Sequence, residues 1–191
     1  VFEKGKLAGQ VSWSLFGGHN RCNGLSAIAA ASHVGVSVDK ACEALSSFKG
    51  VKRRLETIYR SKTITLYDDF AHHPSAIKKT LEGIRRQYPQ ELILAVIEPR
   101  THTMSLGALQ ADLISCNEDA DQTFWFKGQN IQWDLEKVVS LSSSPSRVFT
   151  DLEILINELE GLSNKTKHTH IVLMSNGAFE GIHTKLIDRL S

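Results

Sequence analysis

Apolar and polar positions along the chain follow two different periods, and the changes of period divide the sequence into strands and helices. From residue 54 onward, short apolar runs typical of strands alternate with longer segments whose apolar positions recur every three to four residues. Strands are expected over 54–60, 63–67, 92–97, 122–126 and 170–174, and helices over 75–88, 106–115, 151–162 and 182–190. This alternation predicts an α/β fold, with a mostly parallel sheet covered by helices on both faces.

The first fifty residues follow a different pattern. Residues 10–15 are expected to form a strand, and residues 25–34 and 38–48 to form two helices, the first of them rich in alanine. The polar stretch GGHNRCNG lies directly ahead of the first helix. Because the chain opens at Val1 close to strand material and without a methionine, we expect it to be a fragment of a longer protein.

The charge, the cysteine content and the apolar runs of the sequence limit the partners and the location that the protein can have. The formal net charge is +1 and no run of basic residues occurs, which argues against nucleic acid or an anionic membrane as a partner. Three cysteines without CxxC spacing suggest neither a disulfide framework nor a zinc site, so a reducing cytoplasm is the simplest location. No apolar run has the length of a membrane span, and residues 1–15 lack the core of a signal peptide.

Three polar clusters each follow directly on an expected strand. They are DDFAHHP (68–74), EPRTH (98–102) and SNG (175–177). Parallel α/β sheets bind ligands beyond the carboxyl ends of their strands, and all three clusters should lie at that edge. The sequence therefore predicts a ligand site there.

Each cluster has a functional and a plainer interpretation. Asp68, Asp69, His72 and His73 could bind a divalent metal or perform acid–base chemistry, or they could form an N-capping loop ahead of the helix that Pro74 begins. Neither interpretation is favoured by the cluster alone.

The arginines also admit two interpretations. The Arg53-Arg54 pair is most simply a solvated basic turn, although Arg54 at the entry to the sheet could reach a phosphate with two hydrogen bonds. Arg100, with Thr101 and His102, could clamp an anion or belong to a plain surface loop.

The remaining polar positions are less specific. Ser175 and Asn176 precede a glycine that lets the backbone approach a ligand, but ordinary helix capping explains them nearly as well. His33, His168 and His170 are interpreted as structural or solvated. The only Gly-Lys pair is followed by leucine, so the chain contains no phosphate-binding loop of the GxxxxGK[ST] type.

Taken in order, five motifs resemble the carboxy-terminal part of a Mur ligase: GGHNRCN, FKGVKRRLE, YDDFAHHPSAI, IEPRTHTM and MSNGAFEGIH. Within that family the last two motifs are most similar to the member that joins the tripeptide L-alanyl-γ-D-glutamyl-meso-diaminopimelate to UDP-N-acetylmuramate in peptidoglycan recycling. One alternative is the member that adds L-alanine to UDP-N-acetylmuramate. A second, from a different class, is a metal-dependent hydrolase using Asp68, Asp69, His72 and His73.

The resemblance implies a domain organisation and a chemistry. Residues 1–47 would be a short strand–helix tail of the central ATP-binding domain, and residues 48–191 the Rossmann-like carboxy-terminal domain, with a hinge near 46–49. The bacterial, cytoplasmic enzyme would use ATP and Mg²⁺ to form an acyl phosphate that the tripeptide amine attacks. The phosphate-binding loop and the Mg²⁺ ligands would lie upstream of Val1, so this chain alone should be inactive, and no metal ligand is expected within it.

The resemblance also assigns roles to residues. Asn20 and Asn23, with His19 beside them, would contact adenine; Arg54 would reach the ATP phosphates and Asp69 would lie near the ribose. Arg54 and Asp69 are thus the expected catalytic residues. The expected residues of the peptide substrate site are His72, His73, Arg100, Thr101, His102, Ser175 and Asn176.

Overall fold

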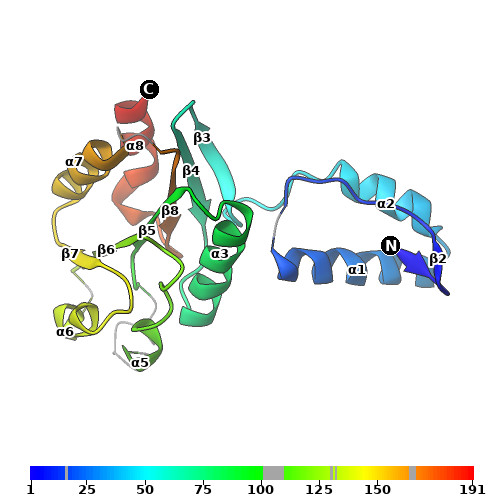
Figure 1. Ribbon diagram of the computed structural model, residues 1–191, viewed down its shortest axis with the longest axis horizontal. Coiled ribbons are helices and arrows are strands. Elements are labelled where there is room, and N and C mark those ends of the chain that lie inside the picture. Colours follow the sequence, from blue (N-terminus) through cyan, green and yellow to red (C-terminus); the bar gives the residue numbers. More distant parts are fainter. Residues whose placement is uncertain (16, 101–109, 130, 132, 164–166) are drawn as a thin grey trace. The chain divides into compact units, whose positions relative to one another are not determined.

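The computed structural model describes residues 1–15, 17–100, 110–129, 131, 133–163 and 167–191. The chain forms two compact units, Val1–Val51 and Lys52–Ser191 (Figure 1). The division lies a few residues beyond the boundary expected from the motifs. Among the described residues, no helix combines the length and apolar character that crossing a bilayer requires.

The first unit consists of two helices and a small hairpin. Strands β1 (Phe2–Glu3) and β2 (Lys6–Leu7) pair antiparallel, and helices α1 (Gly18–His33) and α2 (Val38–Ser46) follow. The prediction of a strand over 10–15 is wrong, because these residues belong to no described sheet. In the described part of the chain, no strand lies alongside them to complete their backbone hydrogen bonds.

Helix α1 begins seven residues earlier than expected, so most of the GGHNRCNG motif lies within its first turns rather than ahead of it. Gly24 is a poor helix former, but a Cβ at that position would lie 2.7 Å from Cη2 of the Trp13 ring. The glycine therefore allows the Trp13 ring to pack directly against the helix backbone.

The core of the first unit is small. It consists of Ile28 from α1 with Ala41 and Cys42 from α2, surrounded by partly buried side chains. Within α1, which is described throughout, only Gly24 and Ile28 are buried, although the helix is apolar on several sides and Leu25 is 53% exposed. A helix that is apolar all round is suited to burial against more neighbours than this unit supplies.

The rates at which the three cysteines are alkylated should show whether α1 and α2 pack against each other. We expect a small alkylating reagent to label Cys22 fastest, because Cys22 is exposed on α1 whereas Cys42 and Cys116 are buried. Burial also raises the pKa of the Cys116 thiol to about 12, which removes the reactive thiolate at neutral pH. Mass spectrometry of the labelled chain checks this order. Labelling of Cys42 as fast as Cys22 would show that α1 and α2 do not pack in the isolated chain.

The second unit is built on a six-stranded sheet. In sequence its strands are β3 (Glu56–Arg60), β4 (Ile64–Asp69), β5 (Leu92–Ile97), β6 (Gln122–Phe126), β7 (Ser146–Phe149) and β8 (Thr169–Met174). The order across the sheet is β3-β4-β8-β5-β6-β7, with β3 antiparallel to β4 and every other pair parallel. The predicted α/β architecture with a mostly parallel sheet is confirmed.

Helices cover both faces of this sheet (Figure 1). They are α3 (Pro74–Gln87), α5 (Gln110–Leu113), α6 (Leu135–Ser140), α7 (Leu152–Ser163) and α8 (Ile182–Leu190), with a 3₁₀ turn at Phe179–Gly181 before α8. On one face, α7 and α8 form a continuous core with alternate residues of the strands, such as Leu66, Leu94 and Leu173. The other face is covered by α3, whose Ile77, Leu81 and Ile84 are fully buried.

In the second unit, helix α6 and strand β7 were not expected from the sequence, because six and four residues are too short to establish a clear period. The loop expected over 140–146 is confirmed for residues 141–145, which join the two. Of the helix expected over 106–115, the structure describes Gln110–Leu113, which ends two residues earlier than expected. Residues 101–109 lie outside the described residues.

Candidate functional site

The return of the chain to the centre of the sheet brings the three polar clusters together. Strand β8 is the last in sequence but lies between β4 and β5, and Asp69 and Ile97 both pair with Met174. Beyond that level, the Ser175 amide donates to the Asp69 carbonyl at 3.2 Å, and the Glu98 amide donates to the Met174 carbonyl at 3.0 Å. The three clusters are therefore neighbours at the carboxyl edge of the sheet, as the strand pattern predicted.

The Arg53 side chain contacts the ends of both β4 and β8 at this edge. Its Nη2 donates to the carbonyls of Ser175 at 2.6 Å and Gly177 at 2.9 Å, and its Nε lies 3.3 Å from Oδ2 of Asp68. The expectation of a solvated basic turn is wrong for Arg53, because backbone carbonyls at the end of β8 bind its guanidinium. The arginine therefore joins the segment before β3 to the ends of both β4 and β8.

The backbone around Arg53 is bent to make these contacts. Arg53 and Leu55 have positive φ angles of 57° and 51°, a conformation that residues with a side chain adopt at some cost. The Leu55 amide donates to Oδ2 of Asp69 at 2.6 Å, and the Ala71 amide donates to Oδ1 of Asp69 at 2.7 Å. One carboxylate thus holds both the bent segment and the loop that follows β4.

Burial governs the titration of Asp69. The residue is 5% exposed, and desolvation raises the pKa of its carboxyl, although the two amide donors and the nearby Arg54 oppose the rise. Both oxygens are occupied by backbone donors. In the structure Asp69 therefore positions the backbone near Arg54.

The pKa of Asp68 is shifted in the opposite direction to that of Asp69. Burial raises the pKa of its carboxyl, but His183, whose Nε2 lies 3.2 Å from Oδ1, and then Arg53 outweigh burial, so that the pKa falls below the ordinary value of 3.8. The pairing stabilises the ionised form of Asp68 in the folded chain.

The Asp68 pairing should make stability pH-dependent in a defined direction. Because the folded-state pKa lies below the unfolded value of 3.8, the stabilisation is complete above about pH 5 and is lost as pH falls through the folded-state pKa. We therefore expect the unfolding free energies of the wild type and Asp68→Asn to differ most near neutral pH and to approach one another as pH falls below the unfolded value of 3.8. Urea unfolding of both proteins at several pH values measures the difference, and a constant difference down to about pH 3 would contradict the pairing.

The histidines after β4 organise the start of α3. His73 is the N-cap of the helix, with Nδ1 accepting from the Ser75 amide at 3.3 Å, and Pro74 begins the first turn. His72 is half-buried, and its Nδ1 donates to the Phe70 carbonyl at 2.8 Å. For His73, the N-capping interpretation is confirmed.

The metal-dependent hydrolase is not supported. Asp68 and Asp69 are engaged by the donors described above, and in the described part of the chain their potential ligand atoms do not gather with those of His72 and His73. Among the described residues, the only group of three or more such side chains that comes together is Glu91, His168 and His170, at the other edge of the sheet.

A second network joins the ends of β5 and β8. Ser175 donates from Oγ to the buried Glu98 carboxylate at 2.5 Å and accepts from the Gly177 amide at 2.9 Å. A Cβ on Gly177 would lie 2.3 Å from Nη1 of Arg100, so the arginine side chain lies directly against the Gly177 backbone. Asn176 Oδ1 is buried without a hydrogen-bond partner among the described residues, which leaves it able to accept one from a ligand.

Arg54 differs from its neighbour. It is exposed, and its guanidinium Cζ lies 5.6 Å from the centre of the Phe70 ring. The guanidinium of Arg53 also faces this ring, at 5.3 Å. Phe70 and His183 are site residues that the sequence analysis did not single out, although Phe70 stands in the middle of the DDFAHHP motif and His183 is the last residue of MSNGAFEGIH.

The other expected site residues are distributed as follows. His19, Asn20 and Asn23 lie on α1 in the first unit; His19 and Asn23 are exposed and Asn20 is half-buried. Asn20 and Asn23 are three residues apart and share one face of the helix. Thr101 and His102 lie outside the described residues.

Comparison with known proteins gives consistent matches. The family model "Mur ligase, glutamate ligase domain" matches residues 53–177. A Haemophilus influenzae protein named UDP-N-acetylmuramate–L-alanyl-γ-D-glutamyl-meso-2,6-diaminoheptandioate ligase is 40% identical over 191 residues, which are 100% of this chain and 42% of that protein. A UDP-N-acetylmuramate–L-alanine ligase of Levilactobacillus brevis is 40% identical over 124 residues, 65% of this chain and 28% of its own length.

A solved structure agrees with these matches. The crystal structure of a murein peptide ligase from Psychrobacter arcticus has a TM-score of 0.70 and 40% identity, covering 94% of this chain and 38% of that one. The chain thus spans less than half the length of the full-length relatives it matches. With its six-stranded sheet, the network at the carboxyl edge and a family match over most of the second unit, the chain belongs to the Mur ligase family.

Proposed function

We propose that this chain is the carboxy-terminal part of an ATP-dependent ligase that joins L-alanyl-γ-D-glutamyl-meso-diaminopimelate to UDP-N-acetylmuramate. The observation that carries the proposal is the extent of the similarity. The match to the H. influenzae ligase named for this tripeptide covers all 191 residues of the chain, whereas the match to the L. brevis L-alanine ligase covers 124 residues. The bacterial cytoplasm is the proposed location.

Within such an enzyme, Arg54 and Asp69 would act at the nucleotide. Arg54 is an exposed cation beside the bound Arg53, and it can neutralise the charge of a transferring phosphoryl group. Asp69 lies near the ribose in this proposal, and it positions Arg54 through its hydrogen bond with the adjacent Leu55 amide. Asn20 and Asn23 would contact adenine, because an amide side chain offers both a donor and an acceptor, and His19 would lie beside them.

The first unit would belong to the central ATP-binding domain, with the phosphate-binding loop and the Mg²⁺ ligands in the sequence that precedes Val1. Its exposed apolar side chains support this proposal, since α1 is apolar on more sides than its own unit covers. A hinge near residues 46–49 would let the second unit carry Arg54 to the nucleotide.

The peptide would bind at the Arg100 side of the edge. Arg100 lies against Gly177, and the unpartnered Asn176 Oδ1 can accept a hydrogen bond from a peptide N–H. Arg100 would pair with a carboxylate of the tripeptide. Ser175, His72, His73, Thr101 and His102 complete the proposed peptide site.

Replacing Gly177 with alanine should test this site in the full-length enzyme. The added Cβ would lie 2.3 Å from Nη1 and 2.8 Å from Cδ of Arg100, so the arginine must move away. Loss of one charged hydrogen bond predicts a KM for the tripeptide raised about tenfold, with the KM for ATP unchanged. Gly161→Ala is the matched control, because nothing lies within 4 Å of a Cβ at Gly161. An unchanged tripeptide KM would remove Arg100 from the peptide site.

The proposed activity is tested with the full-length protein. Incubated with UDP-N-acetylmuramate, the tripeptide, ATP and Mg²⁺, it should form the UDP-linked tripeptide with ADP and phosphate, and the 191-residue chain alone should not. Replacing the tripeptide with L-alanine should reduce the rate at least about tenfold, as the loss of one charged contact already would. Preference for L-alanine would assign the protein to the other branch of the family, and no ATP-dependent product with either amine would overturn the proposal.

A further inference from the structure

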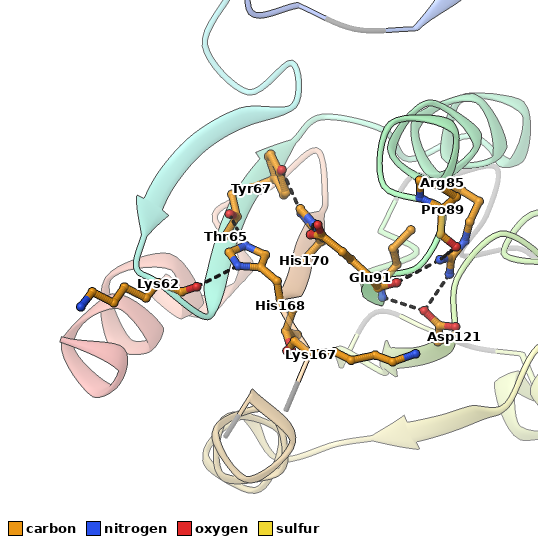
Figure 2. A network of polar contacts seen from close by, with 12 residues as sticks. Lys62, Thr65, Tyr67, Arg85, Pro89, Glu91, Asp121, Lys167, His168 and His170 are labelled. Carbon is orange, nitrogen blue, oxygen red and sulfur yellow. Dashed lines mark hydrogen bonds and ion pairs between the residues drawn. The ribbon is translucent and has the colours of Figure 1, made fainter. Parts of the chain in front are cut away.

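A second cluster of chemically reactive side chains lies at the opposite edge of the sheet from the proposed ligase site. Glu91 directly precedes β5, His168 directly precedes β8, and His170 lies in β8 (Figure 2). Amino ends of parallel strands meet at one edge, which explains why segments far apart in sequence converge here. None of these residues has a role in the proposed ligation.

The side chains are close enough to share a ligand. His170 Nε2 lies 2.5 Å from Oε2 of Glu91, and one potential ligand atom from each of Glu91, His168 and His170 lies within 4.8 Å of the others. His170 is buried, whereas Glu91 and His168 are half-buried. The group is thus anchored in the protein on one side and open toward solvent on the other.

Hydrogen bonds orient both imidazole rings. His168 Nδ1 donates to the Lys62 carbonyl at 3.1 Å, which leaves the lone pair on Nε2, where the Thr65 hydroxyl lies at 2.9 Å (Figure 2). His170 Nδ1 lies 3.0 Å from the hydroxyl of Tyr67, which can donate or accept and so serves either tautomer. Metal-binding histidines typically have this arrangement, in which one ring nitrogen binds the metal and the other bonds a fixed protein group.

The backbone beneath the cluster is held by the sheet. Leu92 donates its amide to the His168 carbonyl at 3.0 Å, and Arg85 donates from Nη1 to the Glu91 carbonyl at 3.0 Å. The Tyr88 ring stacks on His170 with centroids 4.1 Å apart. Little backbone reorganisation is therefore needed to bring the three ligands to one ion.

From this convergence we propose that Glu91, His168 and His170 bind one transition-metal ion of the zinc class. Two imidazoles and a carboxylate suit Zn²⁺ or Co²⁺, whereas Mg²⁺ and Ca²⁺ require oxygen ligands. Ligands about 2.0–2.1 Å from a tetrahedral ion lie about 3.3 Å from one another, so the Glu91 carboxylate must move about 1 Å away from His170 Nε2. Ligand atoms as much as 4.8 Å apart must approach one another, which the half-buried side chains of Glu91 and His168 allow once His168 Nε2 releases the Thr65 hydroxyl. The ion replaces the proton between Glu91 and His170, which leaves to solvent, and a water molecule fills the fourth position.

The alternative is a hydrogen-bond network that binds no metal, and the 191-residue chain distinguishes the two. We expect Co²⁺ to bind with a stoichiometry of one, to give the intense visible absorption of a tetrahedral site, and to be displaced by Zn²⁺. Glu91→Gln and His168→Gln should each weaken binding more than about tenfold. Tyr67→Phe removes only the group that orients His170 and should weaken binding about tenfold.

The control is His33→Gln, which alters an exposed histidine of α1 in the first unit and should bind Co²⁺ as the wild type does. Zn²⁺ should also raise the Tm of the wild type and of His33→Gln, but not of Glu91→Gln. Absence of the tetrahedral spectrum in the wild type would overturn the proposal. So would a spectrum that survives both Glu91→Gln and His168→Gln, whose folding is checked by circular dichroism.

Discussion

Replacing Arg53 with alanine is expected to lower the free energy of unfolding of the second unit by about 2–4 kcal/mol. The guanidinium donates to two carbonyls at the end of β8 and pairs with Asp68, and its side chain is only 31% exposed. The variant leaves those carbonyls without their donor and the mostly buried Asp68 carboxylate with His183 as its remaining partner, and alanine keeps the cost of the positive φ angle. Urea unfolding monitored by circular dichroism measures the loss.

Arg54→Ala is the matched control, because the two arginines are adjacent in sequence but only Arg53 is bound to the ends of the strands. Arg54 is exposed, and its removal should change the unfolding free energy by less than about 0.5 kcal/mol. Equal effects of the two substitutions would show that the contacts of Arg53 do not stabilise the fold.

The same Arg54→Ala substitution is expected to have the largest effect on catalysis. In the full-length enzyme, it should lower kcat at least about tenfold, because a cation that contacts the transferring phosphoryl group acts mainly in the transition state. Arg54→Lys should recover part of the rate, since a lysine restores the charge but not the paired hydrogen bonds of a guanidinium. Steady-state kinetics with ATP and tripeptide varied in turn provide the measurement.

The contacts around Arg54 should separate a loss of catalysis from a loss of structure in this test. The Leu55 amide donates to Asp69, and the Arg53 carbonyl accepts from the Phe70 amide at 2.7 Å. The backbone on either side of Arg54 is thus held independently of its side chain, so the variant should retain the site around it. A kcat equal to that of the wild type would remove Arg54 from the proposed site.

Much of the architecture follows from local pattern. The run Leu92–Ile97 is apolar throughout because its strand is covered on both faces, and the period of Ile77, Leu81 and Ile84 matches the face that α3 buries. The edge at which the polar clusters meet was also predictable, because parallel strands place their carboxyl ends together. The edge strand β7 was missed, since four residues carry too short a period.

The sequence by itself determined the α/β alternation, the family and the edge at which the polar clusters gather, because each depends on local periodicity or on motifs in order. The motifs singled out Arg54, but nothing in the local sequence indicated that Arg53, an identical side chain in the same turn, is bound to the ends of the strands. That difference is decided by tertiary structure, since the left-handed backbone at Arg53 and the carbonyls at the end of β8 bind one guanidinium and leave the other exposed. The partnership of Glu91 with His170 is likewise tertiary, because residues 79 positions apart meet only when β8 inserts beside β5.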